Sequence, residues 1–210
     1  MTFTQALLGF AAVAAVLTVI PGLDTTLVLR SALVRGNGYA VATALGIGTG
    51  ALIWGAAAAV GAAALLAASE VAYRVVTLGG AVYLVYLGVM LIVKSVRTHG
   101  LEVEGTAGEA ISKWRGFLTG VWTNLLNPKI GAFYLATIPQ FVPAGVSPLG
   151  MGLLLAGVHD LLAVAWFALI IAGASYARRW LANARALRVV DRVAGVTLVG
   201  FGVKLALPGH

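Results

Sequence analysis

Four ionisable side chains stand inside long apolar stretches of this sequence, and they are the first candidates for chemistry. They are Asp24, Lys129, His159 and Asp160. A charge near the centre of a bilayer costs at least about 2.5–3.5 kcal/mol, so it normally faces a partner charge or a water-filled cavity. Carboxylates, an ammonium group and an imidazole in such a place can bind a charged solute or carry a proton.

The first of these charges follows a predicted helix break in VIPGLDTTLVLR, residues 19–30. Pro21 removes one helical hydrogen bond, Gly22 lets the chain bend, and Thr25 supplies a hydroxyl group. We expect Asp24 to bind substrate or a coupling ion, because intramembrane carboxylates are functional by default. The alternative is that Asp24 only caps a second half-helix, since Asp is a good N-cap.

A second predicted break has the sequence Asn127-Pro128-Lys129. Pro128 again frees backbone groups, and Asn127 can satisfy one of them or bind a ligand. Lys129 can neutralise Asp24 as a purely structural partner. It can instead meet a substrate carboxylate, with the pairing to Asp24 broken and remade during a cycle.

His159 and Asp160 are neighbours in the chain, and such a pair suits proton transfer because His titrates near neutrality. Asp160 lies about 11 residues into its apolar stretch, near the middle of a bilayer at about 1.5 Å per residue. We expect Asp160 to belong to the site. Adjacent helical residues point in different directions, so the alternative for His159 is a hydrogen bond between helices.

Membrane helices must position these side chains. Of the 210 residues, 60% are hydrophobic and 10% are charged, whereas about 25% are charged in a soluble domain. We therefore predict an all-α protein embedded in a lipid bilayer. The chain has no cysteine, which excludes disulfides and thiolate metal sites, and we expect no cofactor and no metal. A net charge of +7 would suggest nucleic acid for a soluble protein, but its distribution among loops explains it here, and we expect no nucleic-acid partner.

Six apolar stretches are predicted to span the membrane, and we number them spans 1 to 6. They are about Gln5–Leu29, a stretch within Gly36–Ser69, Val75–Val93, about Gly116–Ile138, Leu149–Ser175 and Val193–Leu207. A crossing needs roughly 20 apolar residues, and only span 6 is short. The loops after spans 1, 3 and 5 hold 11 of the 14 Lys and Arg residues. The positive-inside rule places these loops in the cytoplasm and both termini outside. On the outer side, Arg74 has Glu70 four residues earlier as a partner.

The sequence also contains an internal repeat. RVVTLGGAVYLVYLGVML from Arg74, in span 3, and RVVDRVAGVTLVGFGVKL from Arg188, in span 6, share nine residues without gaps. A Gly-Phe pair precedes Pro21 in span 1 and Pro128 in span 4 by the same distance. Spans 2 and 5 each carry a Trp at compatible offsets. Three matches in the same order indicate two homologous three-helix halves.

This repeat predicts the organisation of the chain. Residues 1–93 form the first half, residues 94–115 a cytoplasmic connector, and residues 116–210 the second half. Three spans per half turn the second half upside down relative to the first. Inverted repeats are a transporter architecture whose substrate site lies near the midplane between broken helices. Spans 1 and 4, broken at Pro21 and Pro128, are the predicted walls of that site. In span 2 we expect the glycines to serve close helix packing.

The sequence resembles the LysE/RhtB family of bacterial amino-acid exporters over nearly its whole length. The resemblance is carried by IPGLD at 20–24, the Gly-rich span 2, YLVYLG at 83–88, NPK at 127–129 and IPQFV at 138–142. It implies a multi-pass inner-membrane exporter of amino acids or close derivatives, driven by the proton gradient or the membrane potential. The family usually has Pro-Gly-Pro before the Asp, whereas this chain has Leu23 in the third place. The retained Asp24 favours neutral substrates such as threonine or homoserine over basic ones.

The working hypothesis is therefore an efflux carrier for a small zwitterion. The half-helix N-termini and Lys129 would bind its carboxylate. Asp24 or Asp160 would receive its ammonium group, or would carry the coupling proton when substrate is absent. Two alternatives are an intramembrane enzyme that uses Asp24, His159 and Asp160 as acid–base groups, and a membrane scaffold. The sequence leaves the oligomeric state open, with a homo-oligomer among the alternatives.

Overall fold

The computed structural model describes residues 1–95, 112–174, 176 and 183–207. All regular secondary structure in these residues is helical. The helices are α1 (Phe3–Val19), α2 (Leu23–Arg35), α3 (Asn37–Ala68), α4 (Glu70–Ser95), α5 (Lys113–Leu125), α6 (Pro128–Thr137), the 3-10 helix η1 (Ile138–Phe141), α7 (Pro148–Ala172) and α9 (Ala184–Ala206). Most of the predicted connector, residues 96–111, lies outside the described residues.

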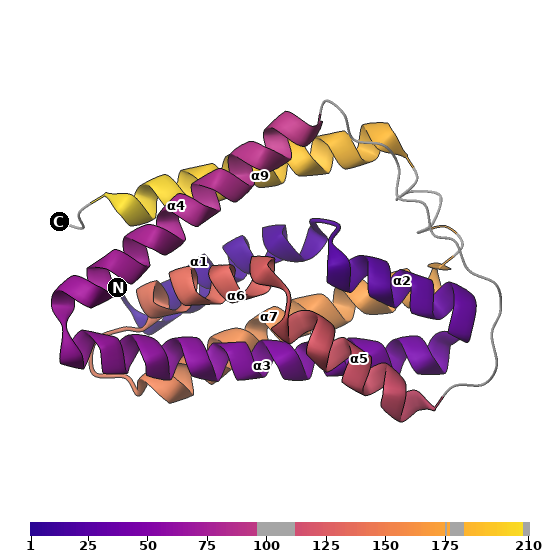
Figure 1. Ribbon diagram of the computed structural model, residues 1–210, viewed down its shortest axis with the longest axis horizontal. Helices are drawn as coiled ribbons and strands as arrows, with labels where there is room; N and C mark the ends of the chain where they lie inside the picture. Colours follow the sequence, from indigo (N-terminus) through magenta and orange to yellow (C-terminus); the bar gives the residue numbers. More distant parts are fainter. Residues whose placement is uncertain (96–111, 175, 177–182, 208–210) are drawn as a thin grey trace.

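The chain runs back and forth along the long axis of the molecule (Figure 1). In that view α1 and α2 run to the right, α3 returns, and α4 runs to the right again. The pair α5 and α6 then returns to the left, α7 runs to the right, and α9 ends near the start of α1. Helices α2, α5 and α9 therefore place their basic residues Arg35, Lys113 and Arg185 at one end of the molecule.

Several helices are long and apolar enough to cross a membrane. Among the described residues they are Asn37–Leu65, Glu70–Val93 and Pro148–Ala172, and the pair α1 and α2 passes the same test with a bend of 53°. The prediction of an all-α membrane protein is thus confirmed. The remaining two predicted spans do not reach this standard, because α5 and α6 are short and α9 carries Arg188 and Arg192. The six-span count stays a prediction.

Both predicted helix breaks are present. Helix α1 ends at Val19 and α2 begins at Leu23, while α5 ends at Leu125 and α6 begins at Pro128. A proline disfavours helical conformation in the residue before it, and the chain is interrupted just before Pro21 and just before Pro128. The alternative that Asp24 caps the second half-helix is wrong. Gly22 is the N-cap of α2, and Asp24 lies in its first turn.

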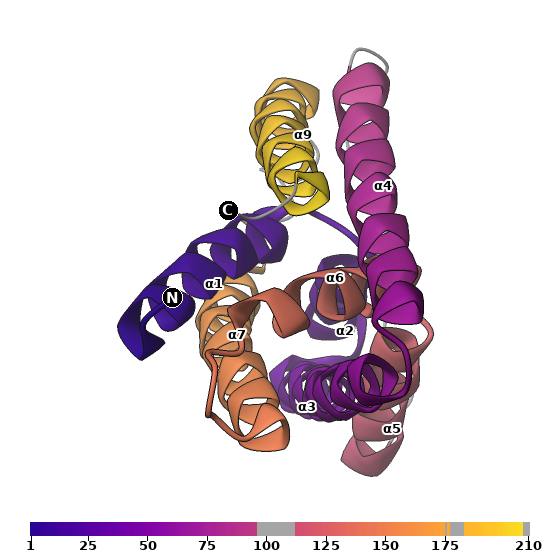
Figure 2. The same ribbon diagram turned by 90° about the vertical axis from the view of Figure 1, so that its left-hand side faces the viewer.

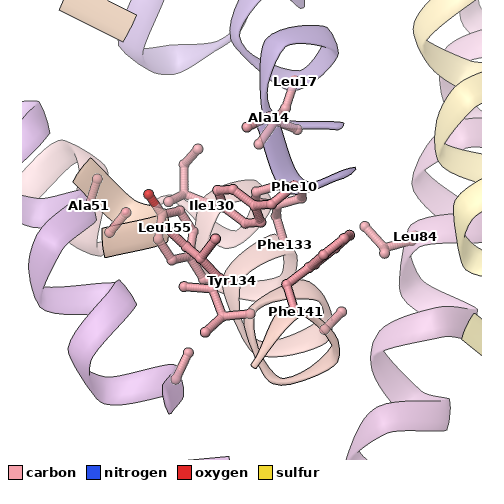
Figure 3. Close-up of a cluster of buried hydrophobic side chains, with 14 of the residues drawn as sticks. Phe10, Ala14, Leu17, Ala51, Leu84, Ile130, Phe133, Tyr134, Phe141 and Leu155 are labelled. Carbon is pink, nitrogen blue, oxygen red and sulfur yellow. The ribbon is translucent and has the colours of Figure 1, made fainter. Parts of the chain in front are cut away.

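The short half-helices occupy the middle of the molecule. In the end view of Figure 2, α6 and α2 lie between α1, α7, α3 and α4. The largest apolar cluster forms around α6 (Figure 3), where the ring of Phe10 lies 5.9 Å from that of Phe133 and 5.7 Å from that of Phe141. This packing fixes α6 against α1 and therefore fixes the position of the second break beside the first.

Glycines bring neighbouring helices into close contact. A Cβ on Gly88 of α4 would lie 2.6 Å from the carbonyl oxygen of Gly195 on α9, and one on Gly202 would lie 2.8 Å from that of Ala81. In α3, a Cβ on Gly46 would overlap the Phe117 carbonyl of α5. Small residues allow membrane helices to approach in this way. The predicted packing role of the span 2 glycines is confirmed at this position.

Candidate functional site

A small cavity lies where the two helix breaks meet. Six of the nine predicted site residues line it, namely Gly22, Asp24, Thr25, Lys129, His159 and Asp160. Asn127 contacts the site through a hydrogen bond, and the two prolines shape the breaks beside it. The structure thus brings side chains of α2 together with side chains of α6 and α7, which come more than 100 residues later in the chain.

The carboxylate of Asp24 is held by two amide groups from the second half of the chain. Asn124 Nδ2 donates to Asp24 Oδ2 over 3.0 Å, and Asn127 Nδ2 donates to Asp24 Oδ1 over 3.4 Å. Both asparagines are buried, with 1% and 3% of their surface exposed. The Asp24 carboxylate is itself half-buried, and such donors offset the cost of holding a charge partly away from water. The first turn of α2 is therefore tied to the second break.

Lys129 reaches from the second break to the first. Its Nζ lies 3.4 Å from the carbonyl oxygen of Ile20, the C-cap residue of α1, and donates a hydrogen bond to it. A Cβ on Gly22 would lie only 3.1 Å from this Nζ. Among the described residues no ion pair joins Lys129 to Asp24. The ammonium group lies in the gap between α1 and α2, where the carbonyl groups at the end of α1 have no hydrogen-bond partner inside the helix.

The N-terminus of α2 has free backbone donors. Its N-cap is Gly22, which has no side chain to cap the helix, and no other side chain among the described residues accepts from this end. The first N–H groups of a helix have no partner inside the helix, so those of Leu23 and Asp24 remain for a ligand or water. Two of the residues in this turn, Asp24 and Thr25, line the cavity. An uncapped helix start beside an ammonium group is a favourable place for a carboxylate.

His159 and Asp160 lie on the opposite wall, on α7. His159 is buried, and its Nδ1 lies 2.9 Å from the hydroxyl of Tyr134 on α6. The alternative of an interhelical hydrogen bond is therefore realised, while the ring also lines the cavity. Within the described part of the chain, Asp160 has no hydrogen-bond partner. A Cβ on Gly48 would lie 3.4 Å from Asp160 Oδ2, so the carboxylate packs against α3 at a position that has no side chain.

Sequence reasoning missed Asn124, which lines the cavity, and Tyr134, which bonds to His159 beside it. An available signal was the second amide in TNLLNPK, because Asn inside an apolar span seeks a partner on another helix. Asn124 Oδ1 is buried without a hydrogen-bond partner among the described residues. A Cβ on Gly50 would lie 2.9 Å from that oxygen, so the glycine makes room for the amide. The site therefore holds one acceptor that a ligand or water can satisfy.

The cavity is small in this conformation. It offers about 30 Å³ to water-sized molecules, which is room for about two waters. An amino acid would fit only after the surrounding helices move apart. Among the described residues no group of three His, Cys, Asp or Glu side chains could hold a metal ion. The ionisable side chains that line the cavity are two carboxylates, one ammonium group and one imidazole.

Comparisons with known proteins agree on one family. The sequence pattern of the family described as LysE type translocator matches residues 15–209. The chain is 31% identical to the membrane protein YrhP of Bacillus subtilis (strain 168), over 97% of this chain and 99% of that protein. It is 25% identical to the threonine efflux protein of Escherichia coli (strain K12), over 89% and 90% of the two chains. It is 28% identical to the leucine efflux protein of Enterobacter sp. (strain 638), over 90% of each. No solved structure matches.

Proposed function

The chain belongs to the family of LysE type translocators, and we propose that it is a secondary active exporter of neutral amino acids or close derivatives. Members of this family are transporters. The chain is accordingly a membrane transporter and not an enzyme, and the alternatives of an intramembrane enzyme and of a scaffold fall away. The names of the threonine and leucine efflux relatives support a neutral substrate over a basic one.

The proposed architecture is six spans in two inverted halves in the bacterial cytoplasmic membrane. The reciprocal contacts of α4 and α9 support it. When the repeat is aligned, Ala81 corresponds to Gly195 and Gly88 to Gly202. The contacts join Gly88 to Gly195 and Gly202 to Ala81, as a twofold relation requires. The basic end of the molecule would face the cytoplasm, with both termini outside. At the other end, Arg74 is paired with Glu70 over 2.9 Å, as the sequence predicts.

The substrate would bind between the breaks with its two charges separated. Its carboxylate would accept hydrogen bonds from the N-terminus of α2 and from Lys129. Its ammonium group would meet Asp24 and the unsatisfied Oδ1 of Asn124. The observation that carries this proposal is the half-buried Asp24 carboxylate, which lines the cavity and accepts hydrogen bonds from two amides of the other half of the chain. A structural carboxylate would need neither the cavity nor the uncapped helix end.

Asp24 or Asp160 would carry the coupling proton when substrate is absent. Both carboxylates line the cavity, and a carboxylate that alternates between a proton and an ammonium group links the two movements. Because the cavity holds only about two waters, the halves must separate to admit an amino acid. Rocking of one half against the other would open the site to each side in turn.

The test is Asp24→Asn in purified protein reconstituted into liposomes. Counterflow of threonine, homoserine, leucine and lysine identifies the substrate of the native chain. We expect Asp24→Asn to lower that counterflow by about 100-fold, because a half-buried, hydrogen-bonded charge that would face the substrate ammonium group is lost. The matched control is Glu70→Gln, which removes an exposed acid outside the cavity and should leave counterflow unchanged. Normal counterflow by Asp24→Asn would refute the site, and no counterflow of any amino acid by the native chain would refute the function.

A further inference from the structure

A second and larger cavity lies between α2, α3 and α5, toward the basic end of the molecule. It offers about 230 Å³, several times the space of the central cavity. Its polar lining consists of Arg30, Ser31, Arg35, Tyr39 and Thr119. Figure 1 shows the three helices converging there, where α2 ends and α5 begins. This space is large enough for a small amino acid in the conformation that the structure describes.

The lining is positively charged and rich in donors. Arg35 is engaged, since its Nη1 donates to the Tyr39 hydroxyl over 2.8 Å. Arg30, by contrast, has no acceptor among the described residues. The hydroxyl of Ser31, a residue only 4% exposed, likewise lacks a hydrogen-bond partner in the described part of the chain. No acidic side chain is among the lining residues. The exposed guanidinium group of Arg30 and the buried hydroxyl of Ser31 line the same cavity, and such donors together suit the two oxygens of a carboxylate.

The two cavities are neighbours along the same helices. Thr25 lines the central cavity and Ser31 the outer one, and six residues of helix correspond to about 9 Å. On α5, Asn124 lines the central cavity and Thr119 the outer one, and five residues of helix correspond to about 7.5 Å. The residues between them on α2 and α3 include the fully buried Val28 and Thr43. A single packed layer therefore separates the basic cavity from the site between the breaks.

We propose that this cavity is the first binding subsite for the exported amino acid on the cytoplasmic side. Arg30 and Ser31 bind the substrate carboxylate there, before it moves one layer deeper to the N-terminus of α2 and Lys129. The proposal rests on the proposed function, because its ligand is the substrate of that export. It adds a recognition site that acts on only one side of the membrane.

The one-sided action gives a direct test with Arg30→Gln. Transport is measured in inverted membrane vesicles, which present the basic end to the medium, and in right-side-out vesicles. The probe is the amino acid that gives counterflow with the native protein. In inverted vesicles we expect the half-saturating concentration to rise about tenfold, because one charge-assisted hydrogen bond is lost. In right-side-out vesicles it should stay within about twofold. In inverted vesicles, Arg30→Lys should have a half-saturating concentration between those of the native protein and Arg30→Gln. Lysine keeps the positive charge but loses the planar guanidinium group that can bind both carboxylate oxygens.

The matched control is Arg185→Gln, which removes an exposed positive charge at the same end of the molecule but outside the cavity. It should leave both half-saturating concentrations unchanged. A lipid phosphate is the competing ligand for Arg30. An Arg30→Gln effect that appears with phosphatidylglycerol in the vesicles and vanishes in phosphatidylcholine alone would overturn the proposal. Unchanged values for Arg30→Gln on both sides would overturn it too, while native transport would still support the exporter.

Discussion

The two helix breaks occupy corresponding places in the two proposed halves, yet they are built from opposite chemistry. The first break leaves its half-helix open, because its N-cap Gly22 has no side chain and no other side chain in the described part of the chain accepts from the end of α2. The second break closes its own end. The side chain of Asn127 accepts from the backbone N–H of Lys129, and Pro128 at the first helical position has no N–H to satisfy. Only the first break can therefore offer backbone donors to a ligand.

The corresponding positions are also complementary in charge. With the two prolines aligned, Gly22 corresponds to Lys129, and Asp24 corresponds to Gly131. A Cβ on Gly131 would lie 2.7 Å from the ring of Trp54, so an aromatic side chain fills the place that an acid takes in the first half. At each of these two aligned positions, one half has a glycine and the other half has a charged side chain. We infer that the two breaks together form one site, in which the first break supplies the acid and the second supplies the cation.

The strongest test of this contrast is Lys129→Gln, which removes the cation that the second break extends to the first. We expect counterflow to fall about 10- to 100-fold, because a charge-assisted hydrogen bond to the substrate carboxylate is lost. The measurement is counterflow in proteoliposomes at equal protein content. Lys204→Gln serves as the control, since that lysine lies in the last turn of α9, outside the cavity. Full activity of Lys129→Gln would mean that the second break contributes no cation to the site.

The breaks themselves could be predicted from the sequence, because a proline disrupts a helix through its own covalent structure. The pair Glu70 and Arg74 was predictable for a similar reason, since its partners are one helical turn apart. The partners of Asp24 could not be predicted. Asn124 lies 100 residues away in the chain, and an amide in an apolar span gives a weaker signal than a charge. The choice of Gly22 over Asp24 as N-cap was also open, because both residue types are found at helix starts.

A smaller effect is expected for Gly22→Ala, which tests how closely the two breaks must approach. Ala is compatible with the extended backbone of this residue, whose φ is −155°. Its Cβ would lie 3.1 Å from Lys129 Nζ and 3.6 Å from Lys129 Cε, so the ammonium group must shift. We expect about threefold to tenfold lower counterflow, the loss typical of a weakened hydrogen bond.

The control for this change is Gly61→Ala in α3, where a Cβ would meet no heavy atom within 4 Å. It should transport like the native protein. The counterpart in the second half is Gly131→Ala, which would press against Trp54 and lower thermal stability by overpacking. Native counterflow by Gly22→Ala would show that the position of the Lys129 ammonium group is not critical.

The smallest effect on transport is expected at Asn127, where two roles of one side chain can be separated. Asn127→Ala removes both the cap on Lys129 N and the donor to Asp24, whereas Asn127→Ser keeps a capping oxygen and loses only the donor. Because the bond to Asp24 is long, at 3.4 Å, both changes should lower counterflow by only about twofold. They should differ in stability, since losing an N-cap costs about 1 kcal/mol. Thermal unfolding of the purified proteins in detergent measures that difference. If the Ser and Ala variants unfold at the same temperature, the Asn127 side chain does not cap α6. The contrast between an uncapped α2 and a capped α6 would then no longer explain why the substrate carboxylate binds at α2.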